Sequence, residues 1–228
     1  MRKILMILTS HGTMDRTDDE TGVWLGEFTG PYYEMLDNGC EVTIASPKGG
    51  QPPVDPMSRL TENITASNRR FQDDTPTQLA FANTVKIDEV VAADYDGVFY
   101  SGGHGPLWDL ANNEVSGRLI VDMLNANKPV ATLCHGPAAL IKAAALQPGL
   151  LKDKRITCFT NTEEALVFRS DNIPYKLETA LKKLGANVQS ALLPMTAHVE
   201  VDGLLISGQN PLSAEVTAKA FLKALAIK

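Results

Sequence analysis

Short apolar runs alternate with helical patterns along most of the chain, and this alternation restricts the possible folds more than any other feature. The runs cover residues 3–10, 41–47, 95–103, 128–134 and 154–160. Strands that are apolar on both faces are typical of a parallel sheet covered by helices on both sides. The sequence therefore predicts an α/β fold with a doubly wound, mainly parallel sheet, whose ligands bind at the carboxyl ends of the strands.

Helical patterns fill the intervals between these runs. They cover residues 22–39, 109–128, 173–184 and 211–226, and the last is expected to pack across the sheet. Residues 48–94 differ, because turn formers are followed by a polar stretch without a clear period. We predict that 48–94 is an excursion from the core or a cap near the site, and that residues 1–228 form a single domain.

Charge and cysteine content narrow the classes of partner. The formal net charge is −6, and no basic run is longer than a pair such as Arg69-Arg70, so nucleic acid and membrane surfaces are poor partners. The N-terminal apolar run is too short for a signal peptide, and the three cysteines form no C-x-x-C. These features predict reduced thiols and a cytoplasmic location.

Cys134 lies at the end of the run 128–134, and Gly136-Pro137 opens a helix directly after it. Strand, sharp turn and helix in this order are typical of a nucleophile elbow. The helix dipole at that position is expected to favour the thiolate. A buried structural cysteine is the alternative, but the adjacent His135 and the turn-forming residues favour a nucleophile.

A glycine-rich loop at 101–106 follows another strand and can point backbone amides at an anionic oxygen. The chain contains no phosphate-binding loop and no full dinucleotide fingerprint. Its four histidines have no metal-ligand spacing. We therefore expect no nucleotide cofactor and no metal.

Several segments in order resemble the DJ-1/PfpI superfamily, and specifically its Hsp31-like branch of glutathione-independent glyoxalases. They are residues 22–50, 101–110, 131–140, 156–166 and 206–214, which read GVWLGEFTG…, SGGHGPLWDL, ATLCHGPAAL, ITCFTNTEEAL and ISGQNPLSA. The resemblance implies a flavodoxin-like fold with helices on both faces, a homodimer, and glyoxalase III activity. That activity converts methylglyoxal, a small 2-oxoaldehyde, to lactate without glutathione, metal or another cofactor.

The resemblance also implies roles for four side chains in the site. Cys134 matches the nucleophile, His135 the adjoining catalytic histidine, and Glu27 the helix-borne acid that approaches the thiol. Glu164 matches the acid that orients the histidine, and Glu163 is its alternative because one residue of register separates them.

The same resemblance points to a substrate-binding set around the thiol. Gly103 and the amide of His135 are expected to form the oxyanion site, and His104 and Trp24 are further candidates for the pocket wall. Cys158 stands where this family often has glycine, which would place a second thiol near the site.

Other functions remain open for a chain with an activated thiol. A stress-response chaperone or redox sensor would use Cys134 without turnover, and a cysteine peptidase or amidase would use the same residues on an acyl substrate. His198 and Glu200 resemble the late pair of glutamine amidotransferases, but Thr132 leaves their G-x-C-x-G signature incomplete. We interpret that pair as a coincidence.

Overall fold

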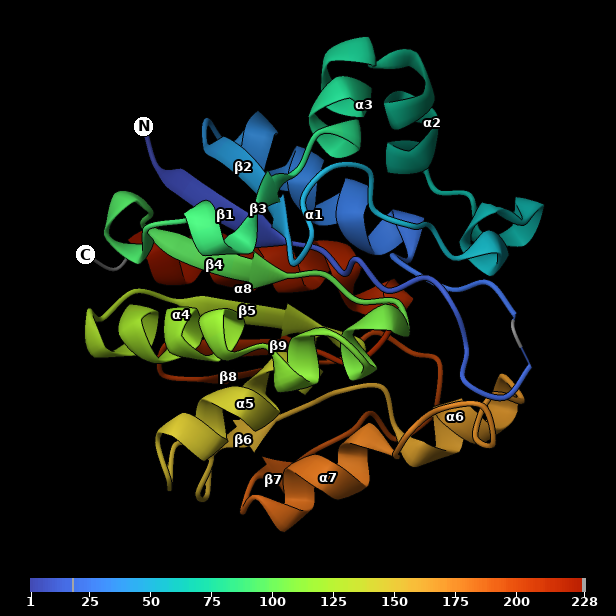
Figure 1. Ribbon diagram of the computed structural model, residues 1–228, viewed down its shortest axis with the longest axis vertical. Helices are drawn as coiled ribbons and strands as arrows, with labels where there is room; N and C mark the ends of the chain where they lie inside the picture. The colour runs from blue at the N-terminus through green and yellow to red at the C-terminus, as the bar shows by residue number, and fades with distance from the viewer. Residues whose placement is uncertain (18, 227–228) are drawn as a thin grey trace.

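The computed structural model describes residues 1–17 and 19–226, in which a seven-stranded sheet forms the centre (Figure 1). The strand order is β3-β2-β1-β4-β5-β9-β8, and every neighbouring pair is parallel except β8 and β9. The strands are β1 (Lys3–Ile7), β2 (Glu41–Ser46), β3 (Val85–Lys86), β4 (Gly97–Tyr100), β5 (Val130–Leu133), β8 (Val199–Asp202) and β9 (Leu205–Gly208). The predicted fold class, a doubly wound and mainly parallel α/β sheet, is confirmed.

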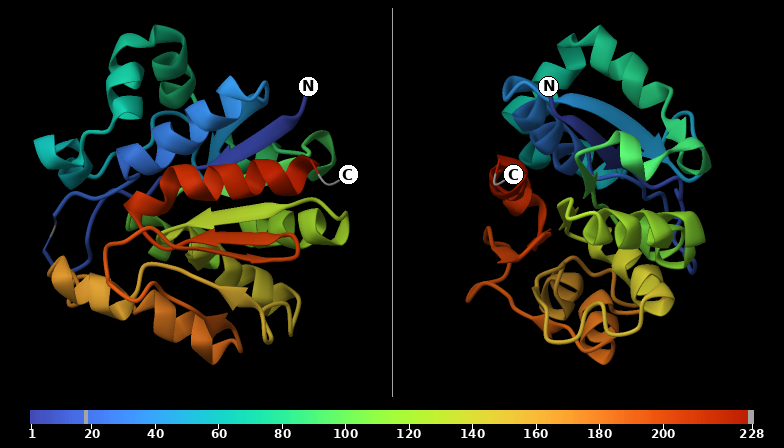
Figure 2. Two further views of the ribbon diagram at one scale, coloured as in Figure 1. Left: turned by 180° about the vertical axis from the view of Figure 1, so that it is seen from behind. Right: turned by 90° about the vertical axis from the view of Figure 1, so that its left-hand side faces the viewer.

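Helices cover both faces of this sheet. Helices α4 (Glu114–Asn125) and α5 (Ala139–Leu146) lie in front of it in Figure 1, and α1 (Leu25–Asp37) and α8 (Ala214–Ala226) cover the opposite face in the left view of Figure 2. Each face has its own apolar core, with Leu119 and Leu140 in one and Phe28 and Phe221 in the other. The central strands β1, β4, β5 and β9 are buried on both sides, which explains why their sequences are almost continuously apolar.

Each of the four predicted helices begins three to five residues later than its pattern indicates. The Asn113 side chain accepts a hydrogen bond from the Ser116 amide and so starts α4 at Glu114, while residues 110–112 form a 3-10 turn. Helix α7 (Leu177–Lys183) starts only after Lys176. Single 3-10 turns also occur at residues 56–59, 61–63, 87–89, 92–94, 105–107, 136–138 and 211–213.

The apolar run at 154–160 is not a strand of the main sheet, contrary to our prediction. Only β6 (Arg155–Ile156) forms there, and it pairs with β7 (Asn187–Val188) in a separate two-stranded sheet. Beyond it the Thr157 amide donates to the Ser207 hydroxyl and the Phe159 amide donates to the Cys134 carbonyl. These hydrogen bonds hold residues 157–159 against the end of the main sheet, and α6 (Asn161–Leu166) follows directly.

Residues 48–94 contain more structure than their polar sequence indicates. Helices α2 (Ala66–Asp73) and α3 (Thr75–Ala82) form there, capped by the side chains of Thr65 and Asp74. Their aromatic rings Phe71 and Phe81 pack on Phe28 of α1, with ring centroids 5.7 and 4.8 Å apart. The segment also supplies the edge strand β3, so part of it belongs to the main sheet.

None of the helices in the described part of the chain combines the length and the apolar content needed to cross a membrane.

Candidate active site

Cys134 follows β5 directly and adopts a left-handed backbone conformation, with φ 58°. Its amide donates to the Gly208 carbonyl and its own carbonyl accepts from Phe159, both at 2.9 Å. A left-handed L-residue is strained by about 1–2 kcal/mol, and these two hydrogen bonds hold the strain in place. A side chain at Gly136 would approach the Tyr100 carbonyl to 2.6 Å, so the turn requires glycine there. The geometry is that of a strained elbow that presents the thiol.

Glu27 lies in the first turn of α1 and is completely buried beside this thiol. A Cβ at Gly102 would overlap its carboxyl group and would lie 2.8 Å from the Cβ of Cys134, so glycine leaves room for the acid. Neither carboxyl oxygen has a hydrogen-bond partner among the described residues. Burial raises the pKa of Glu27 to about 8, although the neighbouring Cys134 and Gly102 oppose the shift. The carboxyl therefore holds a proton at neutral pH.

The thiol of Cys134 does not follow the expectation from the helix dipole. Burial raises its pKa well above the usual value, and the adjacent Glu27 raises it further. The dipole was expected to favour the thiolate, but desolvation and a neighbouring carboxyl outweigh it here. The resting pair is protonated, so sulfur needs a base when it attacks.

His135 is placed to be that base. Its Nδ1 lies 3.4 Å from the sulfur of Cys134, and its Nε2 lies 2.8 Å from a carboxylate oxygen of Glu164. Because a carboxylate accepts, Nε2 carries the hydrogen and Nδ1 is free to accept the thiol proton. Burial alone would raise the pKa of Glu164, but His135 and His104 hold it well below its usual value, so Glu164 is ionised.

Glu163, the alternative to Glu164, does not contact the histidine. It accepts hydrogen bonds from Thr160, from the amide of Met195, and from the side chains of Gln209 and Asn210. Glu163 therefore connects α6 to the loops at residues 195 and 209–210. Glu164 is the residue that reaches His135.

His104 contacts the second oxygen of Glu164 through Nε2 at 2.8 Å. Its Nδ1 lies 3.3 Å from Nη1 of Arg169. Because a guanidinium can only donate, Nδ1 accepts and Nε2 carries the hydrogen. Burial, and then the nearby His135, lower the pKa of His104 to about 4, so the ring is neutral and donates to Glu164.

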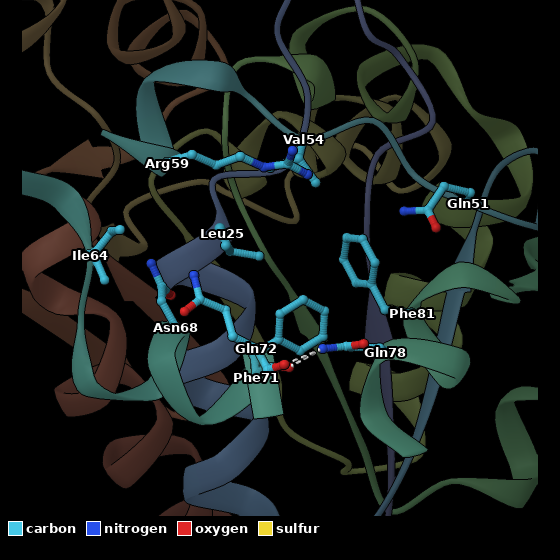
Figure 3. A pocket seen from close by; sticks show the side chains of 10 residues that line it. All are labelled: Leu25, Gln51, Val54, Arg59, Ile64, Asn68, Phe71, Gln72, Gln78 and Phe81. Atoms are coloured by element: carbon cyan, nitrogen blue, oxygen red, sulfur yellow. Dashed lines mark hydrogen bonds between the residues drawn. The ribbon is translucent and has the colours of Figure 1, made fainter. Parts of the chain in front are cut away.

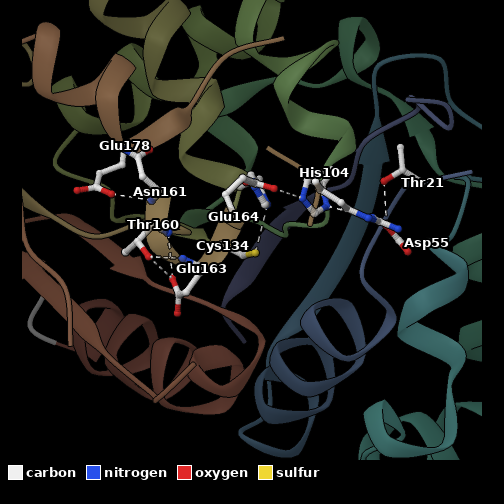
Figure 4. Close-up of polar contacts among 11 residues, drawn as sticks. Thr21, Asp55, His104, Cys134, Thr160, Asn161, Glu163, Glu164 and Glu178 are labelled. Atoms are coloured by element: carbon white, nitrogen blue, oxygen red, sulfur yellow. Dashed lines mark hydrogen bonds and ion pairs between the residues drawn. The ribbon is translucent and has the colours of Figure 1, made fainter. Parts of the chain in front are cut away.

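Two further residues of this network were not found from the sequence. The same Nη1 of Arg169 donates to Asp55 at 2.7 Å, and Asp55 is fully buried and also accepts from Thr21 (Figure 4). The pair is separated by 114 residues, and no spacing in the sequence connects them. Asp55 and Arg169 therefore join residues 48–94 to the histidine network.

A small cavity of about 70 Å³ lies over the thiol. Its walls are Trp24, Met57, Gly103, His104, Cys134, His135, Phe159, Val167, Arg169, Met195 and Pro211. Within the described part of the chain, neither the Gly103 nor the His135 amide donates a hydrogen bond to a backbone carbonyl. The Gly103 amide faces Glu27 and the thiol, where an oxyanion formed at Cys134 would lie.

Other candidate residues lie away from this cavity. Cys158 is buried but does not line it, so it is not a second thiol in the pocket. His198 bonds Glu200 at 3.1 Å beside β8 and does not reach Cys134's cavity either.

The ligand atoms of His104, His135 and Glu164 lie within 4.8 Å of one another, which is close enough for a metal. Both Nε2 atoms, however, point their hydrogens at Glu164. The chemistry of this cluster is that of a hydrogen-bond network, and the expected absence of a metal stays a prediction.

Comparison with known proteins gives a consistent family. A family model described as the DJ-1/PfpI family matches residues 20–224. The Saccharomyces cerevisiae protein named glutathione-independent glyoxalase HSP31 is 29% identical, over 98% of each chain. The X-ray structure of Francisella tularensis Rapid Encystment Protein 24 KDa has a TM-score of 0.92 and 35% identity, over 99% of each chain. The crystal structure of Candida albicans glyoxalase III has a TM-score of 0.87 and 26% identity, over 98% of this chain and 97% of the other.

Proposed function

The chain belongs to the DJ-1/PfpI family, and we propose that it is a glutathione-independent glyoxalase of the Hsp31-like branch. Its substrate is a small 2-oxoaldehyde such as methylglyoxal, and its product is the 2-hydroxy acid, lactate in that case. The names of full-length relatives support this activity. Methylglyoxal and water together have the composition and oxidation level of lactic acid, so the reaction needs only proton transfers and no external oxidant.

The observation that carries the proposal is the protonated, fully buried carboxyl of Glu27 beside the elbow thiol. An acyl-transfer enzyme needs a nucleophile, a base and an oxyanion site, but it has no use for a second proton carrier at the sulfur. An aldehyde isomerisation does need one, because a carbon-bound proton must move. The cavity of about 70 Å³ also suits a small aldehyde better than a peptide.

Addition to the aldehyde comes first in this mechanism. His135 takes the thiol proton at Nδ1, and the sulfur of Cys134 forms a bond to the aldehyde carbon. The carbonyl oxygen becomes an oxyanion held by the amides of Gly103 and His135. Glu27 protonates it, which gives a neutral hemithioacetal and leaves Glu27 as a carboxylate.

Proton transfer between the two carbons follows. The Glu27 carboxylate takes the proton from the former aldehyde carbon, and the imidazolium of His135 protonates the ketone oxygen, which gives an enediol. Glu27 then protonates the second carbon while His135 takes the hydroxyl proton of the first. The product is a thioester on Cys134. A carboxylate whose pKa is raised to about 8 is a stronger base than an ordinary one, which favours this step.

Hydrolysis returns the enzyme to its starting state. Glu27 takes a proton from water as the hydroxide adds to the thioester, and the imidazolium of His135 protonates the departing sulfur of Cys134. Each group then has its original proton, and the 2-hydroxy acid leaves.

The test is lactate formation from methylglyoxal by purified protein free of glutathione, with Cys134→Ala as control. We expect multiple turnovers in the wild type and none in the variant. Stoichiometric loss of methylglyoxal without lactate would point to a redox sensor or chaperone. Peptide or amide turnover that disappears in Cys134→Ala would point to a peptidase or amidase.

We propose further that residues 1–228 form one domain in which 48–94 cap the site. The contact of Asp55 with Arg169 and the place of Met57 in the cavity wall support the cap. A homodimer and a cytoplasmic location are also proposed, from the family resemblance and the charge and cysteine pattern. Light scattering after size-exclusion chromatography tests the first and fractionation of cells tests the second.

A further inference from the structure

A second cavity is separate from the active site. It has a volume of about 380 Å³, within the range of small-molecule sites, and lies between α1 and the helices α2 and α3 (Figure 3). Its lining residues are Leu25, Gln51, Val54, Arg59, Ile64, Asn68, Phe71, Gln72, Gln78 and Phe81.

The inner wall of this cavity is apolar. Phe71 and Phe81 meet edge to face with ring centroids 5.6 Å apart, and Leu25 and Ile64 complete the wall. An aromatic or branched aliphatic group of a ligand fits such a wall. An aromatic ring can make edge or offset contacts with Phe71 and Phe81, and either group is stabilised by the burial of its apolar surface.

The polar groups of the cavity favour an anion. Its lining contains one cation, Arg59, and four carboxamides but no acid. Among the residues that the structure describes, Arg59 forms no ion pair. Gln78 already uses both of its N–H groups on the carbonyls of Phe71 and Gln72. Gln51 and Asn68 each use one N–H group on a backbone carbonyl. The side chain of Gln72 makes no hydrogen bond within the same described residues, so Arg59 and Gln72 are the donors that have no other partner there.

From this combination we propose that the cavity binds a small monocarboxylate with an aryl or branched alkyl body. The carboxylate pairs with Arg59, whose planar guanidinium matches a carboxylate in two hydrogen bonds. The body lies against Phe71 and Phe81.

The bound carboxylate also acts on the active site, through two shared elements. Val54 and Arg59 line this cavity, while Met57 of the same stretch lines the other and Asp55 holds Arg169. Leu25 lies two residues before Glu27 on α1. Occupancy therefore changes the reactivity of Cys134, and this coupling rests on the proposed role of that thiol.

Binding is tested with phenylacetate by calorimetry or ligand-observed NMR on the full chain. We expect saturation in the millimolar range or below. Arg59→Gln should weaken binding by about tenfold or more, since a charge-assisted pair is lost. Arg69→Gln, a change at another exposed arginine of the same segment, should leave binding within twofold. Phenylacetamide, which keeps the ring and lacks the charge, should bind about as weakly as phenylacetate does to Arg59→Gln.

The protein with Cys134 alkylated by iodoacetamide should still bind phenylacetate, which separates this cavity from the active site and from any failure of the glyoxalase proposal. Binding that is absent at 10 mM, that disappears on alkylation, or that is equal in Arg59→Gln and wild type would overturn the site. For the coupling, saturating phenylacetate should change the alkylation rate of Cys134 at least twofold in wild type and not in Arg59→Gln. An unchanged rate in wild type would overturn the coupling while leaving the site.

Discussion

Replacement of Glu27 by glutamine should change how the stability of the protein depends on pH. Burial raises the pKa of this carboxyl from 4.5 to about 8, so the folded protein keeps a proton that the unfolded chain releases above pH 4.5. A raised pKa contributes stability that is fully present below the unfolded value and is lost as the pH rises toward the folded value. Each pH unit in that window lowers the free energy of unfolding by about 1.36 kcal/mol.

Between pH 4.5 and 7 this loss amounts to about 3 kcal/mol in the wild type. Glutamine has no proton to release, so Glu27→Gln lacks this slope. Its amide keeps only the sulfur of Cys134 as a weak partner in the buried site and lowers the stability by about 1–3 kcal/mol, but that amount does not change with pH. The difference in free energy of unfolding, variant minus wild type, should therefore rise by about 3 kcal/mol from pH 4.5 to 7.

Urea unfolding at several pH values between 4.5 and 8 measures this difference. Glu215→Gln, at an exposed position in the first turn of α8, is the matched control and should run parallel to the wild type. Contributions from other groups, including His104, cancel in the comparison. Parallel curves for Glu27→Gln and wild type would refute the argument that a protonated carboxyl is buried beside Cys134.

The same variant tests the chemistry. Glutamine can still donate a hydrogen bond to sulfur but cannot accept the proton from the substrate carbon. We expect that iodoacetamide still alkylates Cys134 in this variant, whereas lactate formation stops. Near-normal turnover would indicate that His135, and not Glu27, takes the proton from the substrate carbon. A thiol that no longer reacts would indicate that Glu27 serves chiefly to set the protonation state of Cys134.

Further predictions concern the network around the histidines. His135→Ala should lower the rate of lactate formation by about two to four orders of magnitude, and an unchanged rate would make it a structural residue. Arg169→Met should lower the free energy of unfolding by about 3–5 kcal/mol, because it leaves Asp55 buried and unpaired; Asp55→Asn in the same chain should recover most of it in urea unfolding. The pKa of His104 is lowered from 6.5 to about 4, so its contribution to stability is present above pH 6.5 and about 3 kcal/mol of it is lost as the pH falls to 4; His104→Gln should flatten that part of the urea-unfolding profile. Activity should survive dialysis against a chelator and removal of small thiols, and a need for added zinc, nickel or glutathione would contradict the glyoxalase III assignment.

The fold class and the elbow could be predicted because both depend on local patterns. Apolar strands, turn formers and helix starts occur in order along the chain, and Cys134 lies between a strand and a turn that admits only glycine at 136. The family resemblance then placed Glu27 and Glu164 by position. The choice between Glu163 and Glu164 could not be made from the sequence, since both are buried in the same short helix and differ only in the direction of their side chains. The prediction that Cys134 favours the thiolate was wrong. It relied on the helix dipole, which is a local feature, whereas the burial that raises the thiol pKa depends on the whole fold.

Residues 48–94 show why the remaining part of the site could not be predicted. Helix α2 buries only Asn68, and α3 only Thr77 and Phe81, so neither has the apolar stripe from which an amphipathic helix is recognised. Asp55 precedes them in a turn-rich stretch, where an acid is ordinarily a solvated residue. Its burial depends on a guanidinium from 114 residues further along the chain, and that guanidinium in turn fixes which nitrogen of His104 carries the hydrogen. The direction of the hydrogen bond from His104 to Glu164 is thus set by the pair of Asp55 and Arg169. Only the folded chain brings these two charges together.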